Sequence, residues 1–234
     1  MTVKGLTDTL RLVGDFIYPR QCHICGGALS GNERYICPVC LAAMPRTLYH
    51  REPDNAMERR FMGQFPYRQA TGHFFYSRES EIAMLMHDLK YHRFRGLARY
   101  LGEVVGRELL TTGFLSDIDL IVPVPMHWLK QARRGYNQTV EIARGLSDVS
   151  GIPVSENLKA VRSHRTQTSL TLAQRLKNTE GVFRLERPHE LDGKGVLLLD
   201  DVCTTGTTLA TAAIELTSKA GNVRLSLLSV GVTF

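Results

Sequence analysis

A run of four apolar residues, Val196 to Leu199, ends in two aspartates, Asp200 and Asp201. A short run of this kind is typical of a strand buried on both faces of a parallel sheet. A loop of threonine and glycine follows and leads into an apolar, helix-like stretch over 209–220. Backbone N–H groups and hydroxyls at a helix start bind anions, and carboxylates beside them suit sugar hydroxyls or hydrated Mg²⁺. The pattern therefore predicts a sugar-phosphate site at the carboxyl edge of a sheet.

Two other interpretations of the same residues stay open. An ordinary buried strand and turn would need no ligand, and two acids at a strand end also occur beside the phosphate-binding loop of nucleotide-hydrolysing enzymes. The second interpretation requires the sequence G-x-x-x-x-G-K-[ST], which the chain lacks. Its nearest match, Gly193-Lys194-Gly195, has no hydroxyl residue and precedes the strand.

Four cysteines form two C-x-x-C pairs near the N-terminus, with 11 residues between the pairs. They are Cys22, Cys25, Cys37 and Cys40. Four thiolates at this spacing predict one tetrahedral, structural Zn²⁺. The surrounding zinc ribbon would be too small for a core of its own, so metal binding would supply its folding energy. Disulfides and redox chemistry are the alternatives, but the first is rare in the cytoplasm and the second usually uses one pair.

The composition bounds the class of protein. The chain has 234 residues, 43% of them hydrophobic and 22% charged, with a formal net charge of +6. These values suit one main core with a small appendage. Asp8, Arg11 and Asp15 interrupt any signal peptide, and no stretch approaches the roughly 20 apolar residues of a membrane span. We therefore expect a cytoplasmic protein, which would reach the inner face of the membrane only through partners.

The hydrophobic pattern predicts four segments along the chain. They are an N-terminal helix within 1–19, the zinc ribbon over 20–45, a linker over 46–72 and a main domain over 73–234. In the main domain, strands near 73–77, 119–124, 154–161, 182–185 and 222–230 alternate with helices near 79–89, 97–110, 137–149, 170–177 and 209–220. Residues 126–135 are expected to form a loop. This alternation predicts an α/β fold with a mostly parallel sheet.

The stretch V-L-L-L-D-D-V-C-T-T-G-T-T closely resembles the phosphoribosyl-pyrophosphate (PRPP) motif of type I phosphoribosyltransferases. The resemblance implies that Asp200 and Asp201 face the ribose hydroxyls, with Mg²⁺ accompanying the PRPP. It implies a 5-phosphate cradle made of Thr204, Thr205, Gly206, Thr207 and Thr208. It also implies a phosphoribosyltransferase-like fold over 73–234, with a pyrophosphate loop after 119–124 and a flexible hood between Val161 and Val182.

Further motifs narrow this resemblance. In order, they are the C-x-x-C pairs, Leu89-Lys90-Tyr91, Val122-Pro-Val-Pro125, Arg133-Arg-Gly-Tyr-Asn-Gln138, and Arg165-Thr-Gln-Thr168 followed by Leu170, Arg175, Asn178 and Gly181-Val-Phe183. Together they are similar to the ComF family (ComFC and GntX type), which joins a zinc ribbon to a phosphoribosyltransferase-like domain. The resemblance covers nearly the whole chain. It implies a role in DNA uptake, either in natural transformation (competence) or in the use of DNA as a nutrient.

Basic residues gather in three stretches without an acid, 89–102, 120–140 and 157–179. The candidate contacts for pyrophosphate or a DNA backbone are Lys90, Lys130, Arg133, Arg134, Arg165 and Arg175. Four aromatic residues, Tyr91, Phe94, Trp128 and Tyr136, lie among them. Cations that follow a backbone and rings that stack on bases are features of a groove for single-stranded DNA. A solvated basic surface is the alternative.

Two functions fit these observations. The one we favour is a DNA-uptake protein that binds single-stranded DNA and keeps a site for PRPP or a related phosphosugar, together with other DNA-uptake proteins as partners. The other is a phosphoribosyltransferase, that is, a glycosyltransferase acting on PRPP and a nucleobase or related acceptor. No segment is clearly dedicated to holding a base, and the sequence leaves open whether the protein is an enzyme.

Overall fold

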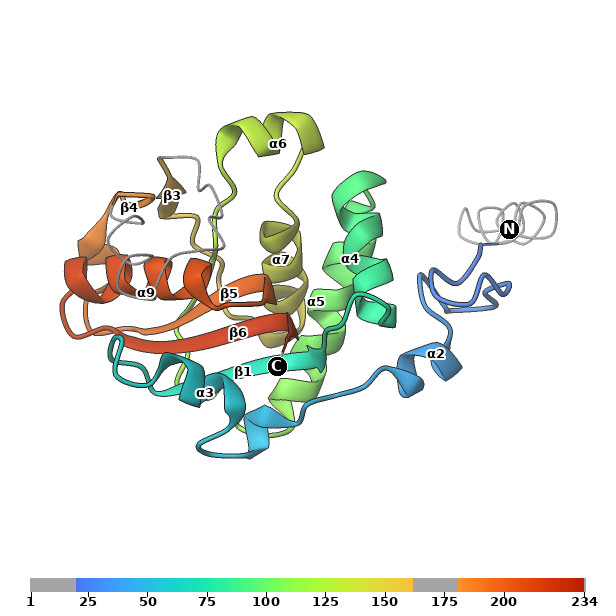
Figure 1. Ribbon diagram of the computed structural model, residues 1–234, viewed down its shortest axis with the longest axis horizontal. Helices are drawn as coiled ribbons and strands as arrows, with labels where there is room; N and C mark the ends of the chain where they lie inside the picture. The colour runs from blue at the N-terminus through green and yellow to red at the C-terminus, as the bar shows by residue number, and fades with distance from the viewer. Residues whose placement is uncertain (1–19, 162–180, 234) are drawn as a thin grey trace, which may run out of the picture. The chain divides into compact units, whose positions relative to one another are not determined.

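The computed structural model describes residues 20–161 and 181–233 (Figure 1). The expected helix within 1–19 lies outside the described residues, as do most of the expected hood, the expected helix near 170–177, Arg165 and Arg175. The chain divides into two compact units, residues 1–44 and 45–234. No helix in the described ranges is long and apolar enough to cross a membrane.

The first unit is built around the two cysteine pairs. An isolated antiparallel β-bridge between Gln21 and Ala28 closes the turn that contains the first cysteine pair. Helix α2 (Pro38–Ala43) begins directly after Cys37, the first cysteine of the second pair. The buried apolar side chains in the described part of this unit are Cys22, Leu29, Ile36 and Met44. So few apolar groups give little hydrophobic stabilisation, which agrees with a fold that depends on a metal.

The second unit contains a four-stranded sheet in which every neighbouring pair of strands is parallel. Its order is β1 (Gln69–Phe75), β6 (Arg224–Val232), β5 (Gly195–Cys203) and β2 (Leu120–Pro123). The apolar run of β5 is buried throughout, because helices cover both faces of the sheet. This arrangement confirms the predicted α/β class with a mostly parallel sheet.

Alternate residues of β5 face different helical layers. Val196 and Leu198 join the core cluster that contains Leu209 and Leu216 of α9 (Thr207–Lys219). The opposite face is covered by α7 (Gln138–Ser150), which packs along α5 (Arg95–Leu110). This second contact is very close, since a Cβ added at Gly145 would lie 1.8 Å from the carbonyl oxygen of Arg99. Glycine is therefore required where the two helices meet.

The remaining elements of the second unit lie around this framework. Helix α4 (Glu81–Tyr91) starts at the Ser80 cap, and a short 3-10 helix, η2 (Pro188–Leu191), precedes β5. Strands β3 (Leu158–Ala160) and β4 (Phe183–Leu185) pair antiparallel as a separate small sheet. The strand expected over 154–161 is thus shorter, with a single bridge from Val154 to Ile121 before it.

Residues 126–135 form a short helix, α6 (Trp128–Arg134), and not only the expected loop. His127 caps its start, and Gly135 ends it in the left-handed conformation with φ 79°. No residue of α6 is buried, so the helix has no apolar stripe that a periodicity search could detect.

Residues 46–72, expected to be a linker, form part of the core of the second unit. They contain the 3-10 helix η1 (Tyr49–Arg51), helix α3 (Ala56–Phe61) and the start of β1. Asn55 caps α3 through its side-chain oxygen, while its Nδ2 donates to three backbone carbonyls. Met57 and Phe61 are fully buried. Because the segment is polar overall, its composition does not reveal the few buried residues that pack it into the second unit.

Candidate functional site

The four cysteine sulfurs of the first unit lie within 4.8 Å of one another. The Sγ atoms of Cys25 and Cys37 are 4.0 Å apart, close to the roughly 3.8 Å that a tetrahedral centre with Zn–S bonds of about 2.3 Å requires. Backbone N–H groups of Gly27 and Cys37 donate to the sulfurs of Cys25 and Cys22. Burial raises the pKa of Cys22, but hydrogen bonds from backbone N–H groups outweigh burial and lower this pKa to about 6. The cluster can therefore hold a metal ion such as zinc.

The two aspartates of the second unit lie at the carboxyl end of β5, beyond the last residue of β2. Asp201 Oδ2 accepts a hydrogen bond from Gln138 Nε2 at 2.8 Å and lies 3.4 Å from Lys90 Nζ. Its Oδ1 accepts from the N–H of Val202 at 2.7 Å. Asp200 is 8% exposed, and its Oδ1 accepts from the N–H of Asp201 at 2.9 Å.

The surroundings push the two carboxyl pKa values apart. Burial raises the pKa of Asp200 well above its ordinary value, and the neighbouring charge of Asp201 raises it further. Burial acts on Asp201 too, but Lys90 and the hydrogen bonds from Gln138 and Val202 prevail and lower its pKa. The pair therefore titrates in two separate steps, with Asp201 ionised first and Asp200 holding its proton to higher pH.

The threonine-rich turn follows directly and leads into α9. Thr204, Thr205 and Thr208 are exposed, and the hydroxyl oxygens of Thr205 and Thr207 lie 3.0 Å apart. Gly206 precedes the helix with φ 79°, and an added Cβ would lie 2.9 Å from the ring of Phe61. Hydroxyls and N–H groups at the start of a 13-residue helix form a local environment that suits an anion.

Arg60 is a site residue that the sequence analysis missed. Its Nη1 donates to the carbonyl oxygen of Thr204 at 2.6 Å, and its Nη2 donates to that of Thr233. Arg60 thus ties α3 to the turn, while Phe61 packs beneath Gly206. Asn55 and Glu58 form a helix-start pattern that could have revealed α3. Nothing local, however, connects Arg60 with a residue 144 positions away.

The structure brings two of the three basic stretches, 89–102 and 120–140, together near Asp200 and Asp201, which we call the acid pair. Arg93 Nη2 donates to the carbonyl oxygen of Arg133 at 3.1 Å, and Arg95 Nη2 donates to that of Gly135 at 2.5 Å. Residues 93–95 therefore support the end of α6. Arg99, from the same stretch, instead pairs with Asp148.

The individual candidate cations have different environments. Lys90 pairs with Asp201, and Arg134 Nη1 donates to Gln138 Oε1 at 3.2 Å. Lys130 and Arg133 are exposed, and neither side chain forms an ion pair within residues 20–161 and 181–233. Of the four candidate cations in the described residues, these last two are therefore the most accessible to a polyanion.

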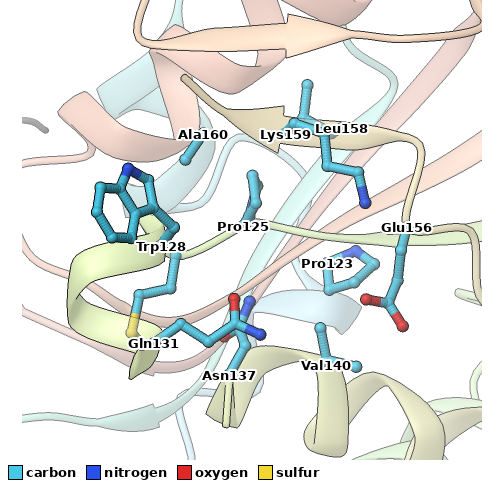
Figure 2. Close-up of a pocket in the computed structure, with 11 residues that line it drawn as sticks. Pro123, Pro125, Trp128, Gln131, Asn137, Val140, Glu156, Leu158, Lys159 and Ala160 are labelled. Carbon is cyan, nitrogen blue, oxygen red and sulfur yellow. The ribbon is translucent and has the colours of Figure 1, made fainter. Parts of the chain in front are cut away.

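A hollow of about 200 Å³ lies beside α6, bounded by the residues after β2, the start of α7, and β3 (Figure 2). Figure 2 shows Trp128 on one side and Glu156 on the opposite side, with Pro125 between them. Asn137 lines the hollow, and the next residue, Gln138, is the hydrogen-bond donor to Asp201. The start of α7 therefore contributes one residue to the hollow and the next residue to the binding of Asp201. Sequence reasoning noticed Trp128 but not this cavity.

Comparisons with known proteins agree with this architecture. The family model described as "Phosphoribosyl transferase domain" matches residues 122–224, which include the acid pair and the threonine turn. "DNA utilization protein YhgH" of Escherichia coli K12 is 29% identical over 218 residues, covering 91% of each chain. "Competence protein F" of Haemophilus influenzae is 38% identical over 117 residues, covering 49% of this chain and 51% of that protein.

The chain is thus similar to proteins named for DNA utilization and for competence. A third relative, "Competence protein ComFC" of Bacillus subtilis, is 24% identical over 197 residues, covering 83% of this chain and 76% of that protein. A solved structure, "Structure of Leishmania donovani UMP synthase", aligns with a TM-score of 0.33 and 15% identity. It covers 65% of this chain and 24% of that one, a likeness too low to carry an argument.

We expect the purified protein to contain one Zn²⁺ per chain, bound by the four clustered thiolates. Cys22→Ser should remove most of the metal and unfold the first unit, because this unit has few buried apolar groups. Elemental analysis together with a thiol-reactivity assay checks this. Cys203→Ser, which alters a cysteine outside the cluster, is the matched control and should retain the metal. A metal-free protein with disulfides would refute the prediction.

At neutral pH, we expect Asp200 to decrease the free energy of unfolding and Asp201 to increase it. Because the pKa of Asp200 is raised, the folded state binds more protons than the unfolded state above pH about 4, so this residue lowers stability as pH rises. Asp200→Asn keeps the acceptor and should increase the free energy of unfolding at pH 7. Asp201 has a lowered pKa, so its contribution is present at neutral pH and is lost as pH falls.

Asp201→Asn should therefore decrease the free energy of unfolding at pH 7 by about 1–3 kcal/mol, because Lys90 loses its charged partner. Urea unfolding of both variants and the unsubstituted protein at pH 5 and pH 7 measures these effects. Equal destabilisation by the two substitutions would show that the carboxyl groups do not titrate separately.

Proposed function

We propose that this protein acts in DNA uptake by binding single-stranded DNA through the cations of α6, beside a retained PRPP site. Relatives named for DNA utilization and for competence support the broad role. A strand would run past Lys130 and Arg133 of α6, with Arg134 and Lys90 closer to the acid pair. Arg165 and Arg175 remain candidate contacts outside the described residues.

The convergence of two basic stretches is the observation that carries this proposal. Arg93 and Arg95 use their guanidinium groups to hold the backbone at the end of α6, and this anchors the helix that carries Lys130 and Arg133. Those two side chains are left available for phosphates in the described part of the chain. Association with a phosphate backbone through such cations depends little on base sequence and strongly on salt.

The environment of the acid pair supports the proposed PRPP site. A phosphosugar would place its phosphate at the threonine turn and its ribose hydroxyls against Asp200 and Asp201. Oxygen ligands such as an ionised Asp201 suit hydrated Mg²⁺, which would neutralise pyrophosphate charge when bound. Gln138 and Lys90 fix the orientation of the Asp201 carboxylate, and Arg60 fixes the turn. The protein could thus respond to a phosphosugar while it holds DNA.

The alternative function is transfer of a phosphoribosyl group from PRPP to a nucleobase or related acceptor. The observation that favours it is the completeness of the acid pair and turn, which a protein binding only DNA would not require. In such a reaction the cations of α6 would stabilise the departing pyrophosphate.

Removal of the two exposed cations of α6 should weaken DNA binding with little dependence on base sequence. We expect Lys130→Ala with Arg133→Ala to reduce affinity for an oligodeoxythymidine. If each side chain contacts one phosphate, the slope of log affinity against log salt should fall by about 1.4, since each contact on a single strand contributes about 0.7. Fluorescence anisotropy across a salt series measures this change.

Lys194→Ala with Lys219→Ala is the matched control, because it removes the same charge from the start of β5 and the end of α9. These positions lie at the edge of the sheet away from the acid pair. The control should bind nearly as well as the unsubstituted protein. If the unsubstituted protein fails to bind oligonucleotides even at low salt, the DNA-binding function is wrong and the transferase becomes the better hypothesis.

PRPP binding provides the second test. Asp200→Ala with Asp201→Ala should abolish the heat of PRPP binding in titration calorimetry with Mg²⁺, because both groups for the ribose hydroxyls are lost. Asp54→Ala with Asp117→Ala removes two exposed carboxylates elsewhere and should bind as before. Circular dichroism of both variants verifies folding. Unchanged PRPP affinity in the first variant would reject the phosphosugar assignment.

A further inference from the structure

Trp128 is the single tryptophan of the chain, and it borders the hollow beside α6 with 64% of its surface exposed. An indole ring usually buries most of its large apolar area. Here the ring belongs to a helix without any buried residue, so packing of the core does not explain its position. An exposed ring at the edge of a cavity is instead well placed to stack on a flat ligand.

The size of the hollow limits what it can hold. Its volume of about 200 Å³ is below the roughly 300–1,000 Å³ of clefts that hold drug-sized ligands. It would therefore accommodate one ring system better than a complete nucleotide. Proline rings and aliphatic groups, including Pro125, Val140 and Leu158, provide flat apolar walls.

Polar groups at the rim add the means to recognise the edge of a ring. Gln131 and Lys159 line the hollow and offer hydrogen-bond donors and an amide oxygen. Glu156 also lines it but pairs with Arg144 at 3.1 Å. The Asn137 side chain is already used, because Nδ2 donates to Val124 and Oδ1 accepts from Thr139. Gln131 and Lys159 are thus the groups available for a ligand.

The surroundings of the hollow favour a nucleic-acid base over other flat molecules. Trp128 shares α6 with Lys130 and Arg133, the accessible cations proposed to contact phosphates. Lys130 and Arg133 lie two and five positions after Trp128 and so project from the other side of α6, and a strand that contacts the cations and the ring would cross this seven-residue helix. Stacking on an aromatic side chain beside a cationic track is the usual way in which proteins hold single strands.

We propose that this hollow binds a single nucleobase, stacked on Trp128 with its polar edge toward Gln131 and Lys159. The inference rests on the proposed function, since the base would belong to the bound strand. A free nucleoside offers the same ring chemistry and is the other source of ligand. Because any base has a flat π-face, the site would tolerate different sequences.

Tryptophan fluorescence tests the inference directly, since Trp128 is the sole source of this signal. The ligands are oligodeoxythymidine, an abasic oligonucleotide of the same length, and thymidine. Binding of the two oligonucleotides is followed separately by anisotropy of a terminal dye. We expect saturable quenching by oligodeoxythymidine and none by the abasic strand, although the abasic strand should still bind through its phosphates.

Two variants separate the contribution of the hollow to DNA binding from that of the cations Lys130 and Arg133. Ala160→Leu would fill the hollow, and Trp128→Leu would remove the stacking ring from an exposed position where folding is not at risk. Each should weaken oligodeoxythymidine binding about 5-fold or more without changing affinity for the abasic strand. Leu129→Ala alters an exposed neighbour on α6 that does not line the hollow, and it should leave both affinities unchanged.

The outcomes distinguish this inference from the proposed function. Quenching by thymidine without any oligonucleotide binding would support the hollow as a site for a free nucleoside, while DNA binding would be wrong. Binding of both strands with equal affinity and without quenching would overturn the hollow as a base site and leave DNA binding intact. Absence of both quenching and strand binding would reject both.

Discussion

Strand β5 is hydrogen-bonded to β6 as far as Cys203, but its pairing with β2 ends at Leu199. The last residue of β2 is Pro123, and another proline follows at position 125, so β2 cannot continue beside the aspartates. The side of β5 next to Asp200 and Asp201 is therefore open. Side chains from two helices, Lys90 of α4 and Gln138 of α7, occupy that side and bind Asp201. The unequal length of two neighbouring strands creates the candidate site.

The same geometry places two carboxyl groups where little water reaches them. A strand end that is buried on one side raises the pKa of Asp200, while a lysine and an amide keep Asp201 charged. Such a pair is unfavourable for a core that has to be stable and favourable for a site that has to bind hydroxyls or a cation. The site therefore depends on α4 and α7 remaining packed against the sheet.

Local patterns were sufficient for some parts of the structure and not for others. The apolar run before Asp200, the cysteine spacing and the alternation of strands and helices each involve few residues that are close in the sequence. They correctly predicted a mostly parallel sheet and a cysteine cluster. Helix α6 has no buried face, and Arg60 acts on a turn far along the chain. The hollow beside Trp128 depends on four separate segments. These features arise only when the chain is folded, so no local signal could reveal them.

The attachment of α3 to the threonine turn constrains how the two units could be recombined during evolution. Phe61 packs against Gly206, and Arg60 binds the turn. Residues 46–72 can therefore support the turn only when they stay in the same chain as the sheet that follows. A gene fusion that exchanged the cysteine-containing unit would preserve the site if its junction fell between Met44 and Pro45. A junction near residue 72 would place a foreign helix beneath the turn. Because α3 supports the turn, the modular boundary of this protein lies before α3, between Met44 and Pro45.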